Sequence, residues 1–328
     1  MTTTVGIISD IHRRPAKEIE KALAVLQQKG ATHLVLNGDI GNCHSALEES
    51  LQRITTIVEA AGKSGLETYV QPGSHETITA YQMVLDVLTQ TYANITDMVR
   101  QPSVDVGDYR LAFLPGSYTP FTGAEYPLQT EEPTGFYIVS AEGVAPFSAE
   151  NFNRLANEGK DPTRMHFTNI NDLKTLVSDP ERTVVFCHEP ARFDEAKEHG
   201  VDFAYFAKSK RGFLPGILLE RELKQREGRD LSREELDKVA QSQGFTFHRE
   251  NVGSEELRAL FDELGILYAV NGHIHESSHH AHTRTQIIAP GTLTPELFWN
   301  SGCFDYGLAG ILMLEDDGVQ YHNIRWDK

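Results

Sequence analysis

The sequence contains Asn271-Gly272-His273-Ile274-His275, which directly follows the apolar run Ile266-Leu267-Tyr268-Ala269-Val270. A run of this kind is typical of a buried strand. If the two histidines continue that strand, their side chains point to the same side, and Gly272 lets the backbone leave sharply. Two converging imidazoles can bind a metal ion, although an isolated His-x-His pair fits a solvated loop equally well.

Earlier apolar runs end in the same way, with a metal-capable side chain directly after the run. These side chains are Asp10 and His12, Asp39, His75, and His188. Helical patterns follow the first three runs, so strands and helices alternate and predict a parallel sheet, whose ligands bind at its carboxyl edge. A lone aspartate after a strand is more often a helix cap or a turn residue, but the repetition favours one shared metal site.

In this order, the motifs resemble those of the calcineurin-like metallophosphoesterase superfamily. The matching blocks are Asp10-x-His12, Gly38-Asp39, Gly73-x-His75-Glu76, His188 and Gly272-His273-x-His275. Ala289-Pro290-Gly291-Thr292 is similar to a turn of the phosphodiesterase-like members. The resemblance covers residues 5 to 292 and implies a four-layered α/β/β/α sandwich, with two mixed sheets flanked by helices.

The resemblance also implies a role for each matched residue. The implied metal ligands are Asp10, His12 and His275 for a first divalent ion, His188 and His273 for a second, and Asp39 as a bridge between them. His75 would stabilise the phosphate or protonate the leaving oxygen, and the two ions would activate a hydroxide. We expect Mn as the metal, with Fe, Zn, Ni or Mg as alternatives.

One position departs from the pattern of this superfamily. The third block has serine at Ser74, where the superfamily has an asparagine whose carbonyl oxygen binds the second metal. A neutral hydroxyl is shorter and a poorer ligand. Ser74 either binds directly or through water, leaves the second site weak, or leaves the site degenerate. We expect an occupied but weaker second site.

The regions between the blocks are long. We expect a single domain over residues 1–328, with inserts at about 116–175 and 193–250 that form lids over the metals. The second insert contains a charged helical segment from about Ile217 to Gln243. Arg13 and Arg192 lie close in sequence to metal ligands and are our candidates for phosphate contacts.

The part of the chain after the last block is predicted to contain a loop and a hairpin. His279, His280 and His282 follow the His-x-His pair, and we interpret them as a solvated loop at the rim of the site, although a histidine-rich tract can bind metal. Two apolar runs separated by Asp316-Asp317-Gly318 predict a hairpin that adds two strands to a sheet.

Composition limits the class of protein. The 328 residues carry a net charge of -17, which disfavours long duplex DNA as an obligatory partner. Three widely spaced cysteines (Cys43, Cys187 and Cys303) and an N-terminus without a signal-peptide pattern lead us to expect a cytoplasmic protein. No apolar run reaches the roughly 20 residues that span a bilayer, so we expect no membrane partner.

Together these features predict a metal-dependent phosphoesterase. A phosphodiester is preferred over a monoester, because Gly272-His273-x-His275 and the later Pro-Gly-Thr turn are more similar to the phosphodiesterase branch. The expected substrate is a small phosphoester, with a nucleotide and single-stranded nucleic acid as candidates. The alternatives are a phosphomonoesterase and a metal-binding scaffold that has lost catalysis through Ser74. The oligomeric state does not follow from the sequence.

Overall fold

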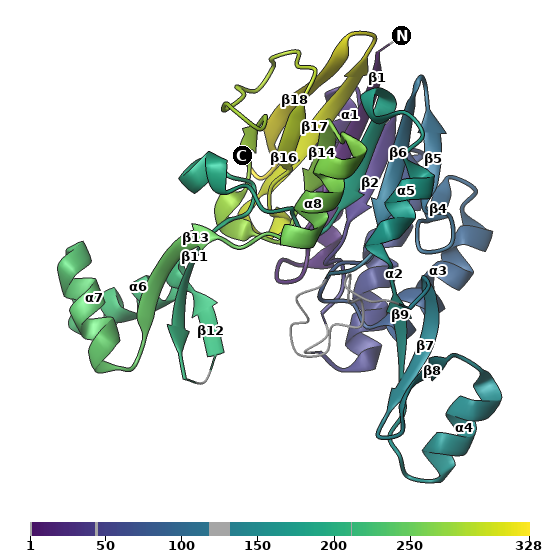
Figure 1. The fold of residues 1–328 in the computed structure, drawn as a ribbon, viewed down its shortest axis with the longest axis horizontal. Helices are drawn as coiled ribbons and strands as arrows, with labels where there is room; N and C mark the ends of the chain where they lie inside the picture. The colour runs from purple at the N-terminus through teal and green to yellow at the C-terminus, as the bar shows by residue number, and fades with distance from the viewer. Residues whose placement is uncertain (1, 43–44, 118–131, 211) are drawn as a thin grey trace.

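The computed structural model describes residues 2–42, 45–117, 132–210 and 212–328, which contain two mixed six-stranded sheets (Figure 1). The first sheet has the strand order β18 (Gly318–Arg325), β17 (Leu308–Glu315), β1 (Thr3–Ile8), β2 (His33–Asn37), β3 (Glu67–Gln71) and β4 (Ile95–Asp97). The second has the order β15 (Ala281–His282), β16 (Leu297–Asn300), β14 (Tyr268–Asn271), β10 (Thr183–Cys187), β6 (Tyr109–Leu114) and β5 (Ser103–Val106).

The central strands of each sheet are parallel, and their carboxyl ends therefore lie at one edge. In the first sheet β1, β2, β3 and β4 run parallel, and in the second β10 is parallel to both β6 and β14. The predicted C-terminal hairpin is confirmed, because β17 pairs antiparallel with β18 and also with β1.

Large apolar side chains fill the space between the two sheets. Val5, Ile7 and Val35 of the first sheet share one buried cluster with Phe186 and Trp299 of the second. The side chains that alternate with them along the strands point away from this layer, as strand geometry requires. The two sheets thus pack face to face over a continuous core.

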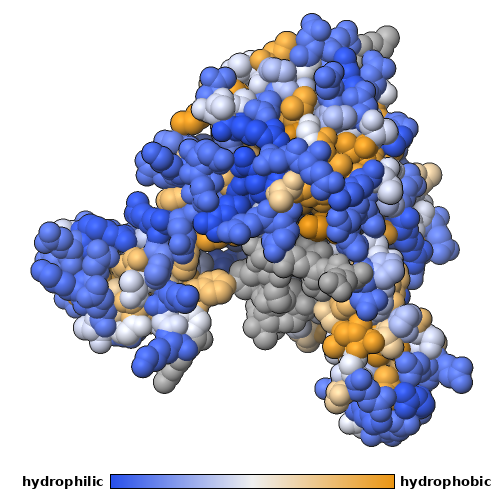
Figure 2. Space-filling view, in the orientation of Figure 1, coloured by the Kyte–Doolittle hydropathy of each residue, from blue (hydrophilic) through white to orange (hydrophobic). Residues whose placement is uncertain are grey.

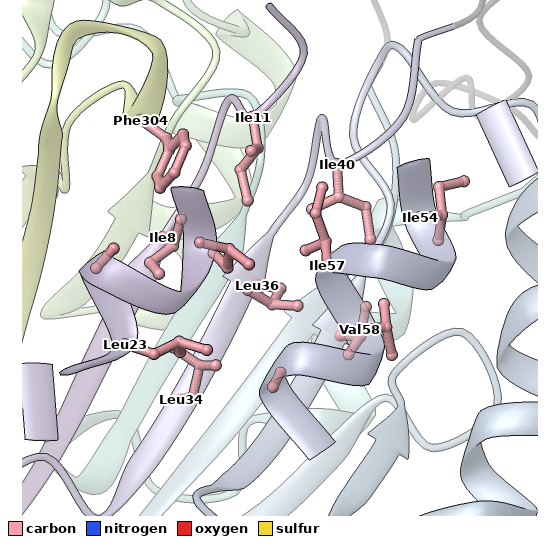
Figure 3. Close-up of a cluster of buried hydrophobic side chains, with 14 of the residues drawn as sticks. Ile8, Ile11, Leu23, Leu34, Leu36, Ile40, Ile54, Ile57, Val58 and Phe304 are labelled. Atoms are coloured by element: carbon pink, nitrogen blue, oxygen red, sulfur yellow. The ribbon is translucent and has the colours of Figure 1, made fainter. Parts of the chain in front are cut away.

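Helices cover the outer face of each sheet. The first sheet is covered by α1 (Ile19–Gln28), α2 (Leu47–Ser64) and α3 (Ile78–Thr91), and the second by α5 (Leu173–Leu176) and α8 (Glu255–Leu264). Figure 3 shows Ile8 and Leu34 of the first sheet beside Leu23 of α1 and Ile57 of α2. The α/β/β/α sandwich predicted from the resemblance is confirmed.

Two small three-stranded sheets project from the sandwich (Figure 1). One contains β7 (Gly135–Ser140), β8 (Gly143–Pro146) and β9 (Thr163–Phe167), with α4 (Ala149–Asn157) beside them. The other contains β11 (Phe203–Ser209), β12 (Gly212–Pro215) and β13 (Thr246–Asn251), with α6 (Gly216–Glu227) and α7 (Arg233–Ser242). Residues 118–131 of the first expected insert lie outside the described residues.

The second projection corrects one prediction. The expected helix from Ile217 to Gln243 is two helices, because Gly228 adopts a left-handed φ of 66° that ends α6. Ser232 and Glu235 then form a capping box that begins α7. The two helices pack on β11 around Ala207, and Figure 2 shows hydrophilic residues over the outer end of this projection.

Candidate metal centre

The acidic and histidine side chains predicted from the sequence meet where the parallel strands of both sheets end. Asp10 and His12 follow β1, Asp39 follows β2, His188 follows β10, and His273 and His275 follow β14. In the described part of the chain their ligand atoms form three groups, each with all atoms within 4.8 Å of one another. The groups are Asp10, His12 and His275; His12, Asp39 and His75; and Asp39, His188 and His273.

The individual distances show two adjoining clusters. In the first, Nε2 of His275 lies 3.3 Å from Nε2 of His12 and 3.4 Å from Oδ1 of Asp10. In the second, Nε2 of His188 lies 3.1 Å from Oδ2 of Asp39. The same His188 nitrogen is 4.0 Å from Oδ1 of Asp10, so the two clusters are contiguous.

Three of these residues have an unusual backbone conformation. Asp10, Asp39 and His273 have φ values of 59°, 55° and 66°, in the left-handed region. Our expectation that His273 and His275 continue an extended strand is wrong, because the chain turns at His273 and His275 begins the short 3-10 helix η5 (His275–Ser277). The left-handed corners, which cost on the order of 1–3 kcal/mol each, turn the side chains into the site.

Two glycines allow the strand ends to approach each other closely. A Cβ atom on Gly73 would lie 2.4 Å from Oδ1 of Asp39, and one on Gly272 would lie 2.7 Å from Oγ of Ser9 and 2.9 Å from Oδ2 of Asp10. Real Cβ atoms do not make contacts that short. These positions therefore need glycine because the neighbouring backbone and carboxylates occupy the space that a side chain would take.

The loop after β3 holds the carboxylate of Asp39. Oδ1 of Asp39 accepts hydrogen bonds from the backbone N–H groups of Ser74 at 2.6 Å and His75 at 2.9 Å. The Ser74 hydroxyl is fully buried, 3.3 Å from both Asp39 oxygens and 3.5 Å from Nδ1 of His273. Glu76 fixes the loop, since its carboxylate accepts from the N–H groups of Gly73 at 2.7 Å and Gly41 at 3.0 Å.

His75 is partly exposed, to about the same extent as His275. Its ring stacks on that of His12 with centroids 4.8 Å apart and planes 9° from parallel, and its Nε2 lies 4.0 Å from Oδ2 of Asp39. The side chain of His75 is 16% exposed, whereas that of Asp39 is 2% exposed. His75 therefore stands at the opening of the cluster, where it can contact both the buried carboxylate and an incoming molecule.

Burial and neighbouring charges shift the pKa values of the cluster in opposite directions. Burial opposes ionisation of Asp10, yet its hydrogen bond with His275 and the charges of His275 and His188 lower its pKa to about 2. Burial also favours neutral His188, but the charge of Asp39 raises the pKa of His188 to about 10. For His12 and His273, burial is the main reason that the pKa falls to about 3. Despite burial, the pKa of His275 is also raised, by its contacts with Cys303 and Asp10, so two protonated histidines, His188 and His275, lie among ionised carboxylates and two neutral imidazoles.

This donor set fits a divalent cation. Nε2 of His12 and Nε2 of His275 face each other at 3.3 Å beside an ionised Asp10, and each imidazole can offer one lone pair. Buried carboxylates in such a cluster need positive charge for compensation. Oxygen and imidazole nitrogen are the ligands of Mn, Fe, Zn and Ni in proteins. The residues present are therefore candidate metal-binding groups.

Comparison with protein families agrees with this geometry. The family model described as calcineurin-like phosphoesterase matches residues 3–277. The chain belongs to the calcineurin-like phosphoesterase family. This family match includes every residue of the three ligand groups. No curated protein sequence matches the chain significantly.

Three solved structures are similar to this phosphoesterase at low sequence identity. One is 15% identical with a TM-score of 0.51, and the match covers 98% of this chain and 99% of that chain. The protein TT1561 of Thermus thermophilus is 11% identical with a TM-score of 0.49, covering 99% and 100%. A dimetal phosphatase from Danio rerio is 11% identical with a TM-score of 0.44, covering 99% of both chains. At these identities the likeness concerns the fold alone.

The two arginines selected from the sequence lie in different surroundings. Arg13 is exposed next to His12, and among the described residues its guanidinium has no ion-pair partner. Arg192 instead pairs with Asp194 at 2.9 Å and with Glu255, at the start of α8, at 3.0 Å. A phosphate contact by Arg192 would require it to leave these carboxylates, whereas Arg13 is available as it stands.

One segment of this phosphoesterase lies next to the first cluster and was not identified from the sequence. The short 3-10 helix η6 (Phe304–Tyr306) places Asp305 beside His12, with Oδ2 of Asp305 3.6 Å from Nδ1 of His12. The Tyr306 ring packs edge-on against His275 with centroids 5.6 Å apart. Only their placement after the apolar β16 could have drawn attention to these residues, because no motif marks them.

Two expectations about cellular context concern the cysteines and the membrane. Cys187 and Cys303 are buried and form no disulfide, and Cys43 lies outside the described residues. Cys187 packs on the helix-covered face of the second sheet, away from the ligands, as the alternation of the strand predicts. Among the described helices, none combines the length and apolar character needed to cross a bilayer.

Proposed function

We propose that this family member is a dinuclear metal-dependent phosphodiesterase. The observation that carries the proposal is the position of Asp39, which belongs to two ligand groups, one with His12 and His75 and one with His188 and His273. A carboxylate shared by adjacent groups is the arrangement expected of a ligand that bridges two cations, since its oxygens are hard donors that can serve both.

We assign the ligands as the resemblance implies. Asp10, His12 and His275 would hold the first ion, His188 and His273 the second, and Asp39 both. When bound, such ions polarise phosphoryl oxygens and lower the pKa of water, with Mn the first candidate and Fe, Zn, Ni or Mg the alternatives. The assignment is supported by the short separations between the imidazole nitrogens and the carboxylates in both clusters.

The residues around the ligands have roles that follow from their exposure. His75, at the opening of the cluster, would donate a proton to the leaving oxygen or a hydrogen bond to the phosphate. Arg13 would pair with the phosphate of the substrate, because its guanidinium is exposed and its neighbour His12 belongs to the cluster. Arg192 would contact substrate only after exchanging its ion pairs, and we rank it below Arg13.

Ser74 is proposed as a weak ligand of the second ion. Its hydroxyl is buried and lies 3.3 Å from Oδ2 of Asp39 and 3.5 Å from Nδ1 of His273, so it lies beside two members of the second ligand group. A neutral hydroxyl binds a cation more weakly than an amide carbonyl would. We therefore propose an occupied second site of reduced affinity.

The preference for a diester, nucleotide or single-stranded nucleic-acid substrate follows from the sequence resemblance. We propose that the chain is one unit, with residues 116–175 and 193–250 as inserts that face the substrate. Both ranges contain one of the small projecting sheets, which supports this division. A cytoplasmic location also stays a prediction.

Purified full-length protein allows a direct test. The measurements are metal content per chain by elemental analysis, followed by hydrolysis of bis(p-nitrophenyl) phosphate and p-nitrophenyl phosphate with added Mn. Two metals per chain with faster diester than monoester turnover is the expected result. Asp39→Asn should abolish turnover and lower the metal content, whereas Asp105→Asn, which changes an exposed carboxylate that pairs with Arg110 outside the cluster, should alter neither.

The other outcomes select the alternatives. Faster monoester turnover would identify a phosphomonoesterase. Bound metal without turnover under any divalent ion, unchanged by Ser74→Asn, would identify a binding scaffold. A chain that binds no divalent metal would overturn the proposal entirely.

A further inference from the structure

Asp305 lies behind His12 and is held in a buried position. Its side chain is 3% exposed, and Oδ1 accepts hydrogen bonds from the backbone N–H groups of Arg13 at 3.0 Å and Arg14 at 2.9 Å. Oδ2 points to Nδ1 of His12 at 3.6 Å, and within the described part of the chain this buried oxygen has no hydrogen-bond partner. One carboxylate oxygen is thus used by the backbone, and the other is available to His12.

The ring of His12 has its two nitrogens in different surroundings. Nε2 faces Nε2 of His275 at 3.3 Å, inside the candidate metal group, whereas Nδ1 faces Asp305 on the opposite side. A metal-binding imidazole must keep the lone pair of its ligating nitrogen, and its proton must therefore lie on the other nitrogen. A carboxylate opposite that second nitrogen selects this tautomer and the orientation of the ring.

The segment that carries Asp305 is fixed to the strand that carries the first ligands. The backbone N–H of Phe304 donates to the carbonyl of Ser9 at 2.9 Å, and that of Asp305 donates to the carbonyl of Asp10 at 3.3 Å. Arg53 donates to the carbonyl oxygens of Ile11 and Arg14 in the same loop. Asp305 therefore holds the loop through its amides, and Arg53 holds it through its carbonyls.

We propose that Asp305 is a positioning residue that holds the His12 proton on Nδ1 and so directs the lone pair on Nε2 into the first metal group. This inference rests on the metal-dependent function proposed above. The residue comes from a segment beyond residues 3–277, the range matched by the family model. The first cluster is thus completed by a part of the chain that the family match does not include.

Asp305→Asn tests this role with little change in shape. One amide end can still accept from the N–H groups of Arg13 and Arg14, but the other end would present N–H donors to Nδ1 of His12. The His12 proton should then move to Nε2, which removes the ligand lone pair. Loss of a supporting carboxylate of this kind weakens metal affinity by about 10–100-fold.

The matched control is Asp327→Asn. Oδ2 of Asp327 lies 2.7 Å from Nη2 of Arg14, so this carboxylate contacts the same loop but does not face His12. The change removes one negative charge from the surroundings of the same loop. A general effect of charge or loop stability should appear in both variants, whereas an effect on the His12 tautomer should appear only in Asp305→Asn.

Two readouts on the full chain separate this inference from the proposed function. Long-range ¹H–¹⁵N correlation spectra of the metal-free protein report which His12 nitrogen carries the proton, and Mn²⁺ titration followed by electron paramagnetic resonance reports affinity. We expect Nδ1–H in the wild type and Asp327→Asn, Nε2–H in Asp305→Asn, and about 10–100-fold weaker binding of one Mn²⁺ in Asp305→Asn only.

Each result has a defined meaning. An Nε2–H tautomer in the wild type would overturn the inference without any variant, even if Asp305→Asn fails to fold. Equal Mn²⁺ affinity of Asp305→Asn and the wild type would also overturn it. If the wild type binds no divalent metal, the proposed function fails, while the tautomer still shows whether Asp305 positions His12.

Discussion

We expect the free energy of unfolding to depend on pH through His282, a buried side chain that lies near the start of β11. His282 is 1% exposed, and its Nε2 accepts a hydrogen bond from the backbone N–H of Val201 at 3.2 Å. Nδ1 lies 2.9 Å from the carbonyl oxygen of Thr283, to which it donates. The contact with Val201 requires a neutral ring, because protonation would remove the lone pair on Nε2 that accepts this hydrogen bond. Burial lowers the pKa of His282 from 6.5 to about 4.

These values fix the sign and size of the effect. Between pH 6.5 and pH 4 the unfolded chain binds a proton at this histidine while the folded chain does not, so stability falls as the pH is lowered. The full contribution is present above pH 6.5. With a folded pKa of about 4 and an unfolded value of 6.5, the unfolding free energy should decrease by about 2 kcal/mol from pH 7 to pH 5 through this group.

Urea unfolding of the metal-free protein at pH 7 and pH 5 measures this term. His282→Gln removes the titrating group, and any pH-independent destabilisation by the substitution cancels in the difference between the two pH values. The difference should shrink by about 2 kcal/mol in His282→Gln and stay unchanged in His199→Gln, which alters an exposed histidine. An unchanged pH dependence in His282→Gln would refute the assignment of a neutral, buried His282.

Three further predictions concern the candidate metal centre. His75→Ala should lower diester hydrolysis by about 10²–10⁴-fold with metal content unchanged, and a smaller loss in the kinetic assay would assign His75 a positioning role. Ser74→Asn should raise affinity for the second ion by about tenfold, roughly 1.4 kcal/mol, in a competition titration; equal affinities would contradict a weak hydroxyl ligand. In Gly73→Ala the new Cβ would lie 2.4 Å from Oδ1 of Asp39, so this variant should lower the unfolding free energy by about 1–3 kcal/mol and reduce bound metal. In the control Gly135→Ala the nearest contact of the new Cβ would be 3.8 Å, and neither quantity should change.

The strands that carry the site were predictable because they are buried on both faces. A parallel strand between two apolar layers needs a continuous apolar run, and such runs are visible in the sequence without any structure. The apolar runs that precede Asp39 and His188 form the strands His33–Asn37 and Thr183–Cys187. Within one sheet the carboxyl ends of parallel strands lie at the same edge, so the proximity of Asp10 and Asp39, which follow β1 and β2, was also predictable.

The conformation of the ligands was not predictable, because contacts from distant parts of the chain impose it. The backbone N–H of Asp10 donates to the carbonyl of Gly38 at 3.2 Å, and that of His273 donates to Oδ1 of Asp10 at 3.1 Å. These bonds hold Asp10 and His273 in the left-handed region, which Asp and His adopt more often than most residues but which the periodicity of a strand does not indicate. Sequence periodicity describes extended strands, and it therefore gave the wrong geometry for His273 and His275.

The histidine-rich stretch after the last motif was interpreted incorrectly as a solvated loop. His282 belongs to β15 and packs between Phe193 and Phe298, with ring centroids 4.8 and 6.0 Å away. His279 lies 3.0 Å from the carbonyl oxygen of Ala309. The polar composition of this stretch predicted that its histidines are exposed. Their rings instead contact backbone groups of segments remote in sequence, and such partners make the burial of a polar ring possible.

The ligands of the proposed metal centre are divided between the two sheets, and this division connects metal binding with folding. Asp10, His12 and Asp39 follow strands of the first sheet, whereas the remaining histidine ligands follow strands of the second. The separation of the two sets is fixed by the core between the sheets, where Val35 and Phe186 pack in one cluster. An unfolded chain does not bring these groups together. Each ion present at a free concentration of 100 times its Kd would therefore stabilise the folded chain by about 2.7 kcal/mol. Asp305 contributes to the same link between metal binding and folding, because its carboxylate connects the C-terminal segment to His12 of the first group.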